Sequence, residues 1–248
     1  MLTQQEQLKY SRQIMLNKVG EQGQRALSQA SVVIIGLGGL GNPTALYLAA
    51  MGIGKLILID GDTIEISNLP RQILFDQNQL QQNKADAATE KLQRQYPDCD
   101  IEVVDEMFDA ELAEFYLPNA DIVLDCTDNI HSRYLINQLC VQYKVPLVIG
   151  AATGFDGQHL FVNSQDNNSA CYHCLYPSSE KAPTNNCQTL GIASPVLAIV
   201  SGMQALTVFN YITLNKAPTN LLSLFDGLTH RWQQFNLQKN KQCQVCAQ

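Results

Sequence analysis

The sequence predicts an α/β fold in which helices cover both faces of a mostly parallel sheet. Five apolar segments have the composition of strands, at 31–36, 55–60, 101–105, 121–127 and 146–151. Segments predicted as helices lie between them, at 42–51, 79–95, 110–117 and 129–144. The first strand is β-branched and continuously apolar, which is typical of a strand buried on both faces. Strands and helices that alternate in this way form a doubly wound sheet with right-handed crossovers.

The pattern changes after residue 151. We expect an antiparallel strand at 158–163, a loop at 165–194, an apolar helix at 195–214 and a hairpin of strands 221–226 and 231–237. A loop of that length inside a compact domain indicates a functional or tethered segment. Before the first strand, Thr3 and Glu6 form a capping-box pattern that opens a helix carrying Arg12, and a second short helix is expected at 21–29.

We therefore expect a single domain with a helical arm at 1–30, an α/β core at 31–151 and a further part at 152–248. Hydrophobic residues make up 46% of the chain and charged residues 16%, which favours a large core and an oligomer. The net charge of −7 argues against a nucleic-acid partner. The polar N-terminus does not resemble a secretory signal, and polar residues interrupt the apolar 195–214 segment, which favours a buried helix over a membrane span. We expect a cytoplasmic protein.

A glycine-rich loop follows the first predicted strand. Gly36, Gly38, Gly39 and Gly41 lie in the pattern Gly-Leu-Gly-Gly-Leu-Gly, between a strand and a helix. In a Rossmann-like fold such glycines permit a tight turn, close approach of the backbone to a phosphate, and tight helix–strand packing. Asp60 ends the next strand, where a carboxylate can hold ribose hydroxyls. On this motif alone NAD would be the favoured ligand.

Further polar groups favour a triphosphate over NAD. They follow predicted strands or begin the next helix, and comprise Asn68, Arg71, Lys84, Asp128 and Asn129. In an open parallel sheet, ligands bind at the carboxyl ends of the strands. Arginine and lysine neutralise phosphates there, and a carboxylate can hold Mg²⁺. Taken singly, Arg71 or Lys84 would be a surface charge and Asp128–Asn129 a helix N-cap; their common location predicts an ATP–Mg²⁺ site.

Two pairs of cysteines predict a metal centre. Cys171 and Cys174 form one Cys-x-x-Cys knuckle, and Cys243 and Cys246 form another. Four thiolates suit tetrahedral Zn²⁺ in a closed, structural site that would tie the long loop to the C-terminal segment. The alternatives are coincidental pairs or an iron–sulfur cluster.

The motifs together resemble the HesA/MoeB/ThiF family of ubiquitin-activating-enzyme-like adenylyltransferases. The resemblance extends in order over essentially the whole chain, through Tyr10-Ser11-Arg12-Gln13-Ile14, the glycine loop, Ser67-Asn68-Leu69-Pro70-Arg71-Gln72, Asp125-Cys126-Thr127-Asp128-Asn129 and the paired knuckles. It implies a homodimer that uses ATP and Mg²⁺ to adenylate the C-terminal glycine carboxylate of a ubiquitin-like sulfur-carrier protein. A separate protein would then donate the sulfur.

By the same resemblance, Gly39, Asp60, Asn68, Arg71, Lys84 and Asp128 would form the nucleotide site. Arg12 would act in the partner subunit's site, and Cys187 would join the carrier's thiocarboxylate through an acyl disulfide. The local motifs, such as Asn186-Cys187-x-Thr189, are most similar to members that act on the thiamine carrier ThiS; a MoaD-like molybdopterin carrier is the alternative. Pro70 and Tyr176 depart from the family pattern, where Gln and Trp are usual.

Two other functional classes share part of this pattern. An NAD-dependent dehydrogenase would account for the glycine loop and Asp60 but would leave Arg71, Lys84 and Asp128 without a role. A non-catalytic scaffold that only recruits a carrier would be expected to have lost nucleotide-site residues, and this chain retains them.

Overall fold

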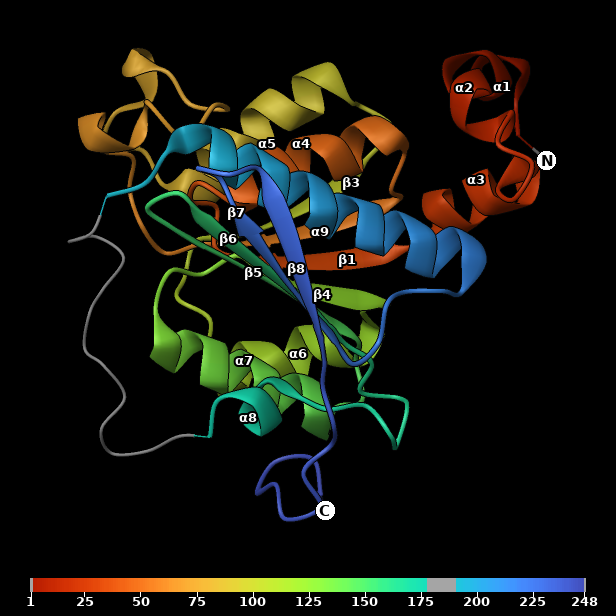
Figure 1. Ribbon diagram of the computed structural model, residues 1–248. Helices are drawn as coiled ribbons and strands as arrows, with labels where there is room; N and C mark the ends of the chain where they lie inside the picture. Colours follow the sequence, from red (N-terminus) through yellow and green to blue (C-terminus); the bar gives the residue numbers. More distant parts are fainter. Residues whose placement is uncertain (1, 178–190, 248) are drawn as a thin grey trace.

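The computed structural model describes residues 2–177 and 191–247, and its centre is an eight-stranded sheet (Figure 1). The strands are β1 Ser31–Ile35, β2 Lys55–Ile59, β3 Asp100–Val104, β4 Ile122–Asp125, β5 Leu147–Thr153, β6 Asp156–Val162, β7 Leu221–Asp226 and β8 Arg231–Asn236. Their order is β3-β2-β1-β4-β5-β6-β7-β8. The first five strands pair in parallel and the last three antiparallel, which confirms the predicted fold class.

Helices cover the two faces of this sheet. One face carries α4 Gly41–Met51, α5 Lys84–Gln95 and α9 Ser194–Leu214, with α3 Gly20–Gln29 beside them (Figure 1). The other face carries α6 Ala110–Tyr116, α7 Ile130–Gln142 and α8 Tyr172–Leu175. Short 3₁₀ turns lie at Ile66–Asn68, Gln77–Gln79 and Leu117–Asn119, and an arm of α1 Gln4–Lys9 and α2 Ser11–Ile14 precedes α3.

Strand β1 shows why the sheet needs helices on both faces. Val32 and Ile34 point into the core that contains α4 and α9, whereas Val33 and Ile35 point into the core on the α7 side. Side chains alternate between the faces of a strand, so a continuously apolar strand is stable only when both faces are covered. Burial on both sides confirms the prediction made from the β-branched run.

Helix α9 is long and apolar enough to cross a membrane by length and composition, but it lies across the sheet (Figure 1). Val196, Val200 and Val208 are buried against the core. Its buried polar groups are paired: Ser201 Oγ donates to the Leu40 carbonyl at 2.9 Å, and Gln204 Nε2 donates to the Asp125 carbonyl at 3.1 Å. In this position α9 supports the ends of β1 and β4.

Several predicted boundaries are corrected by local capping. The helix expected from residue 79 begins at Lys84, because the Asn83 side chain accepts the Ala85 and Asp86 N–H groups and so fixes the first turn. The N-terminal helix expected to carry Arg12 is divided at Tyr10 into α1 and α2.

The long segment between β6 and α9 also contains structure that was not predicted. Residues 172–175 form α8 directly after the first cysteine of the knuckle.

Strand β5 continues past residue 151 to Thr153 and turns through Gly154, whose φ is +60°, into β6. The sheet therefore continues without interruption past residue 151, where the sequence pattern changes.

Candidate nucleotide and metal sites

The glycine loop connects β1 to α4 in a shape that only glycine permits at two positions. Gly36 has a φ of +88°, in the left-handed region, and a Cβ there would lie 3.1 Å from the Cys126 backbone. A Cβ on Gly41 would collide with the Gly36 carbonyl oxygen. Gly38, by contrast, has open space above it, with the nearest group, Gln72 Nε2, 3.8 Å from the position of a Cβ. Gly36 and Gly41 therefore shape the turn, and Gly38 leaves room for a ligand.

Asp60 fixes the loop from the end of β2. Its carboxylate accepts the Leu37 N–H at 2.5 Å and the Asp62 N–H at 2.8 Å. Burial raises the pKa of Asp60 above its ordinary value, and the positive charge of Lys84 and the Leu37 N–H partly offset this. The predicted ribose contact stays a prediction, because the described contacts of this carboxylate are to the protein's own backbone.

Lys84 is directed to the same edge by the first turn of α5. Its side chain is only 9% exposed, and its Nζ lies 2.8 Å from the carboxylate of Asp62. Asp62 was not identified from the sequence, although it lies two residues beyond Asp60. The pair holds a nearly buried cation beside the glycine loop, where a phosphate could share or replace the Asp62 contact.

The segment after β2 brings Asn68, Arg71 and Gln72 to the loop. Asn68 is buried and accepts the Glu65 N–H at 3.1 Å, and Arg71 donates to the Ser67 carbonyl at 2.7 Å. Gln72, which we did not single out, is 2% exposed, and its Oε1 has no partner. The Nδ2 of buried Asn42 also lacks one. Buried amide groups without partners are costly, so these two are candidates for hydrogen bonds to a ligand or water.

Asp128 lies in the turn between β4 and α7. The buried Asp125 carboxylate accepts the backbone N–H and hydroxyl of Thr127 at 2.9 and 2.7 Å. Asn129 caps α7 by accepting the Ser132 N–H at 2.8 Å, which is the ordinary alternative weighed for this pair. Asp128 itself is exposed between these two anchored neighbours, so its carboxylate is available to a cation.

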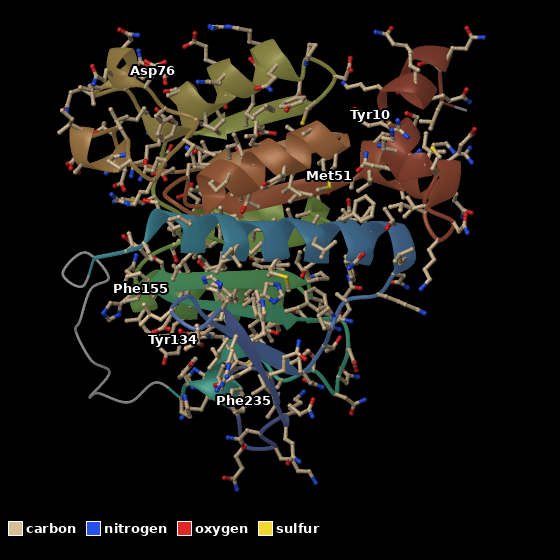
Figure 2. All side chains as sticks on the ribbon, turned by 45° about the horizontal axis from the view of Figure 1, so that its top comes forward. Tyr10, Met51, Asp76, Tyr134, Phe155 and Phe235 are labelled. Atoms are coloured by element: carbon tan, nitrogen blue, oxygen red, sulfur yellow. The ribbon has the colours of Figure 1, made fainter. Side chains whose placement is uncertain are left out.

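Arg12 is the one predicted nucleotide-site residue that the described structure places elsewhere. Its neighbours contact the C-terminal end of α4, since Gln13 Nε2 donates to the Met51 carbonyl at 3.2 Å and the Tyr10 ring lies against Gly52. The glycine loop precedes the N-terminal end of that helix. Figure 2 shows Tyr10 beside Met51 at one end of the molecule and Asp76 at the other. An eleven-residue helix is about 16 Å long, so Arg12 is remote from the loop of its own chain.

The four predicted metal ligands meet on the α7 side of the sheet. Their sulfur atoms all lie within 4.8 Å of one another. The Cys171–Cys174, Cys171–Cys243 and Cys174–Cys246 distances are 4.0, 3.7 and 3.4 Å. A tetrahedral ion with Zn–S bonds of about 2.3 Å requires sulfur atoms about 3.8 Å apart. Four converging thiols at this spacing fit Zn²⁺. Four protein ligands complete a tetrahedral coordination shell and leave no open position for a catalytic water.

A neighbouring amide supports thiolates at this position. Asn137 is fully buried, its Oδ1 accepts the Tyr172 N–H at 2.8 Å, and its Nδ2 has no conventional acceptor but lies beside Cys171. Burial and the neighbouring thiols raise the pKa of Cys171 to about 11. A cation would be needed to keep this sulfur ionised at neutral pH, and the thiolate would then accept the amide N–H.

The predicted reactive cysteine, Cys187, lies outside the described residues. A second buried charge that we did not predict, Arg133, pairs with Asp125 at 3.2 Å beneath the Asp128 turn. The sequence offers a signal for it, because Arg133 is the one Lys or Arg within residues 130–142 of the helix predicted at 129–144.

A separate groove of about 510 Å³ lies between the C-terminal end of α9 and β6. It is lined by amide side chains, Tyr211 and one cation, Lys216. Its lining lacks the glycine loop and the carboxylates found at the strand ends. The candidate nucleotide site is therefore the edge formed by β1, β2 and β4, where the sheet order reverses.

Comparisons with known proteins agree with this arrangement. The profile of the ThiF family matches residues 10–245. The sulfur carrier protein ThiS adenylyltransferase of Escherichia coli K12 is 38% identical over 97% of this chain and 95% of its own length. The molybdopterin-synthase adenylyltransferase of the same strain is also 38% identical, over 100% and 99%. The crystal structure of E. coli MccB with MccA-N7isoASN shares the fold, with a TM-score of 0.83, 23% identity and coverage of 98% of this chain and 75% of that one.

Proposed function

This chain belongs to the ThiF family, and we propose that it uses ATP to adenylate the C-terminal glycine carboxylate of a ubiquitin-like sulfur-carrier protein. The observation that carries this proposal is the convergence of the glycine loop, Asp60, Lys84 and Asp128 at one sheet edge. The 38% identity to two enzymes named as adenylyltransferases supports the reaction class.

The reaction is a transfer of the adenylyl group. A carboxylate oxygen of the carrier attacks the α-phosphorus of ATP, an O–P bond forms, and the bond to the β-phosphate oxygen breaks, so that pyrophosphate leaves. The nucleophile is already an anion, and no general base is required. The barrier arises from bringing anions together and from charge on the phosphates, so positioning and cations are the available means of catalysis.

The residues at the edge match these needs. Lys84 and Arg71 would neutralise phosphate oxygens, and the N–H groups of the glycine loop would face the phosphates. The exposed carboxylate of Asp128 would hold Mg²⁺, which supplies further positive charge at the phosphates. Asn68 and Asn129 would shape the turns that present Arg71 and Asp128.

Arg12 would complete this site in a partner subunit, since it lies at the far end of α4 from its own glycine loop. Mixed dimers test this assignment. Arg12→Ala and Asp128→Ala chains should each be inactive alone, and mixing them should restore about a quarter of the wild-type rate, because one site in half of the dimers is then intact. No recovery in verified mixed dimers would contradict a contribution from the partner.

The carrier is proposed to be ThiS-like, with a place in thiamine biosynthesis. The motifs around Gly154-Phe155 and Cys171-Tyr172 favour this choice, whereas the overall identity to relatives that act in each route is the same, 38%. A MoaD-like carrier in molybdopterin biosynthesis is the alternative. The role of Cys187 in the later sulfur-transfer step is a prediction from sequence.

Carrier-dependent ATP–pyrophosphate exchange tests both levels of the proposal. We expect exchange with a purified ThiS-like carrier at least about ten times faster than with a MoaD-like carrier. Exchange with the MoaD-like carrier alone would overturn the choice of carrier but not the reaction. Absence of exchange with both, in protein that holds its metal, would overturn adenylation.

Asp128→Ala is the matching test of the site. We expect a loss of about 10³-fold or more in exchange, with unchanged unfolding behaviour, because the side chain is exposed and its turn is held by its neighbours. Glu114→Ala, which removes an exposed carboxylate of α6, is the control and should exchange at the normal rate. Near-normal exchange by Asp128→Ala would remove this residue from the site.

A further inference from the structure

Helix α7 separates the nucleotide edge from the four-cysteine cluster and contacts both. Arg133 and Asn137 lie four residues apart and therefore on the same side of the helix. Both side chains are buried, at 9% and 0% exposure. Neither is a candidate ligand of the nucleotide or of the metal.

Arg133 holds the turn that carries Asp128. Its Nε donates to the Asp125 carboxylate at 3.2 Å, and its Nη2 donates to the Thr127 carbonyl at 2.7 Å and to the Gly150 carbonyl of β5 at 3.2 Å. Asn129, on the other side of Asp128, caps the same helix. The backbone on both sides of Asp128 is thus fixed to α7.

Other contacts of α7 hold the first knuckle. Asn137 accepts the Tyr172 N–H and lies beside Cys171, and the Tyr134 hydroxyl donates to the Tyr176 carbonyl at 2.8 Å. The Arg133 guanidinium lies 5.8 Å from the centre of the Tyr172 ring. Every residue from Cys171 to Tyr176 therefore lies within a turn fixed to α7 at both ends.

The charge of Arg133 makes this connection stiff. Burial alone would lower the pKa of the guanidinium, but the Asp125 carboxylate and Tyr172 together outweigh burial, and the pKa is raised. A buried ion pair with several hydrogen bonds resists displacement, because breaking it leaves an uncompensated charge. Gln204 of α9 also holds Asp125, but α9 packs on the opposite face of the sheet from the cysteines.

We propose that α7 couples the two sites: metal binding by the four cysteines fixes the 171–176 turn against α7, and α7 fixes Asp128 for the nucleotide. Arg133 and Asn137 are the positioning residues of this link. Metal and ATP then raise each other's affinity by the same factor, as linkage requires. The inference rests on the proposed function only in taking ATP–Mg²⁺ as the ligand at the strand edge.

The test measures this factor from both directions, without the carrier and hence without turnover. ATP affinity is measured by calorimetry for zinc-loaded and zinc-depleted protein. Zinc affinity is measured by competition with a colorimetric chelator, with and without saturating ATP–Mg²⁺. We expect a factor of about ten in both experiments for the wild type.

Three variants locate the link. Asn137→Leu keeps the size of the side chain but loses both amide contacts, and Gln138→Leu makes the same change on the exposed side of α7. Arg133→Lys keeps the charge but cannot reach its three oxygen partners together. The coupling factor should fall below about two in Asn137→Leu and Arg133→Lys, and stay near ten in Gln138→Leu.

Each outcome decides the question. Equal ATP affinity with and without zinc in folded wild-type protein, or full coupling in Arg133→Lys, would overturn the link. If zinc-depleted protein unfolds, the coupling factor is obtained from the chelator experiment on zinc-loaded protein alone. A zinc affinity that is the same with and without ATP–Mg²⁺ would then overturn the proposal. Absence of ATP binding by zinc-loaded wild type would instead overturn the proposed function.

Discussion

The parallel and antiparallel parts of the sheet prepare for their ligands in different ways. In the parallel part, each group at the nucleotide edge follows a strand end, and the sheet order brings β1, β2 and β4 together. The metal ligands, by contrast, come from two segments far apart in the sequence: Cys171 directly precedes α8, and Cys243, 72 positions later, follows the antiparallel strand β8. The fold creates the first site, whereas the second site holds irregular segments in place. Changes to the first should affect mainly ligand binding, and changes to the second should affect mainly folding.

The sharpest exception to this contrast is Gly41. Gly41→Ala should destabilise the protein by more than about 4 kcal/mol, because the new methyl group would collide with the Gly36 carbonyl, which is backbone and cannot move aside. Urea denaturation measures the effect. Gly202→Ala on α9, where nothing lies within 4 Å of a Cβ, is the control and should be neutral or stabilising. A stable Gly41→Ala protein would show that the loop is more adaptable than its contacts indicate.

Loss of one metal ligand should have the next largest effect. Cys246→Ser should remove zinc from the protein and lower the free energy of unfolding by about 4 kcal/mol at a metal concentration 1,000-fold above the dissociation constant. Zinc content by mass spectrometry and urea denaturation check this. Cys99→Ala changes a buried cysteine outside the cluster and should keep full zinc content. Unchanged stability after zinc loss would mean that the cluster is not structural.

Acid should affect the antiparallel part through His159. This residue of β6 is 1% exposed and bonded to the Thr207 hydroxyl at 2.9 Å, and burial lowers its pKa to about 4. The unfolded chain therefore takes up a proton near pH 6.5 and the folded chain only near pH 4, so stability falls as the pH falls through this window, by about 3 kcal/mol in all.

The measurement is urea denaturation from pH 7.5 to 4.5. His159→Gln should lose this part of the pH dependence, whereas His131→Gln, at an exposed position, should keep it. Comparison of variants that hold the same amount of zinc separates His159 from acid release of the metal. Identical pH profiles for His159→Gln and wild type would show that another group is responsible.

The smallest predicted effect is the cleanest test of the parallel part. Gly38→Ala has room for its methyl group, so stability should change by less than about 0.5 kcal/mol. ATP affinity should fall about tenfold, because that space is the approach of the phosphates to the backbone. Calorimetry and denaturation on one preparation measure both. A Gly38→Ala protein with normal ATP affinity would place the phosphates elsewhere.

The sequence predicted those features that depend on local pattern. Strand and helix order followed from hydrophobic periodicity, the loop from its glycines, and the metal cluster from paired cysteine spacing. Asp62, Gln72 and Arg133 were not found, because their importance comes from contacts with distant parts of the chain. Asp62 gains a role only when α5 brings Lys84 to it, and Arg133 only when Thr127 and Gly150 converge around it.

Helix boundaries failed for a related reason. Residues 79–83 contain no Gly or Pro to mark a boundary, and only the capping contacts of Asn83 decide that the helix starts at Lys84. Similarly, the position of Arg12 at the far end of α4 depends on tertiary packing. No local motif states which end of a neighbouring helix an N-terminal arm will contact.

The position of the cysteines along the chain has a consequence for biosynthesis. Cys243 and Cys246 follow β8, so a ribosome produces every strand of the sheet before the second knuckle appears. The glycine loop and α9, which packs against it, are also synthesised before the first knuckle gains its last two ligands. Complete coordination of the metal is thereby a late event, and a chain cut short after β8 would contain every strand of the sheet but could not close the cluster.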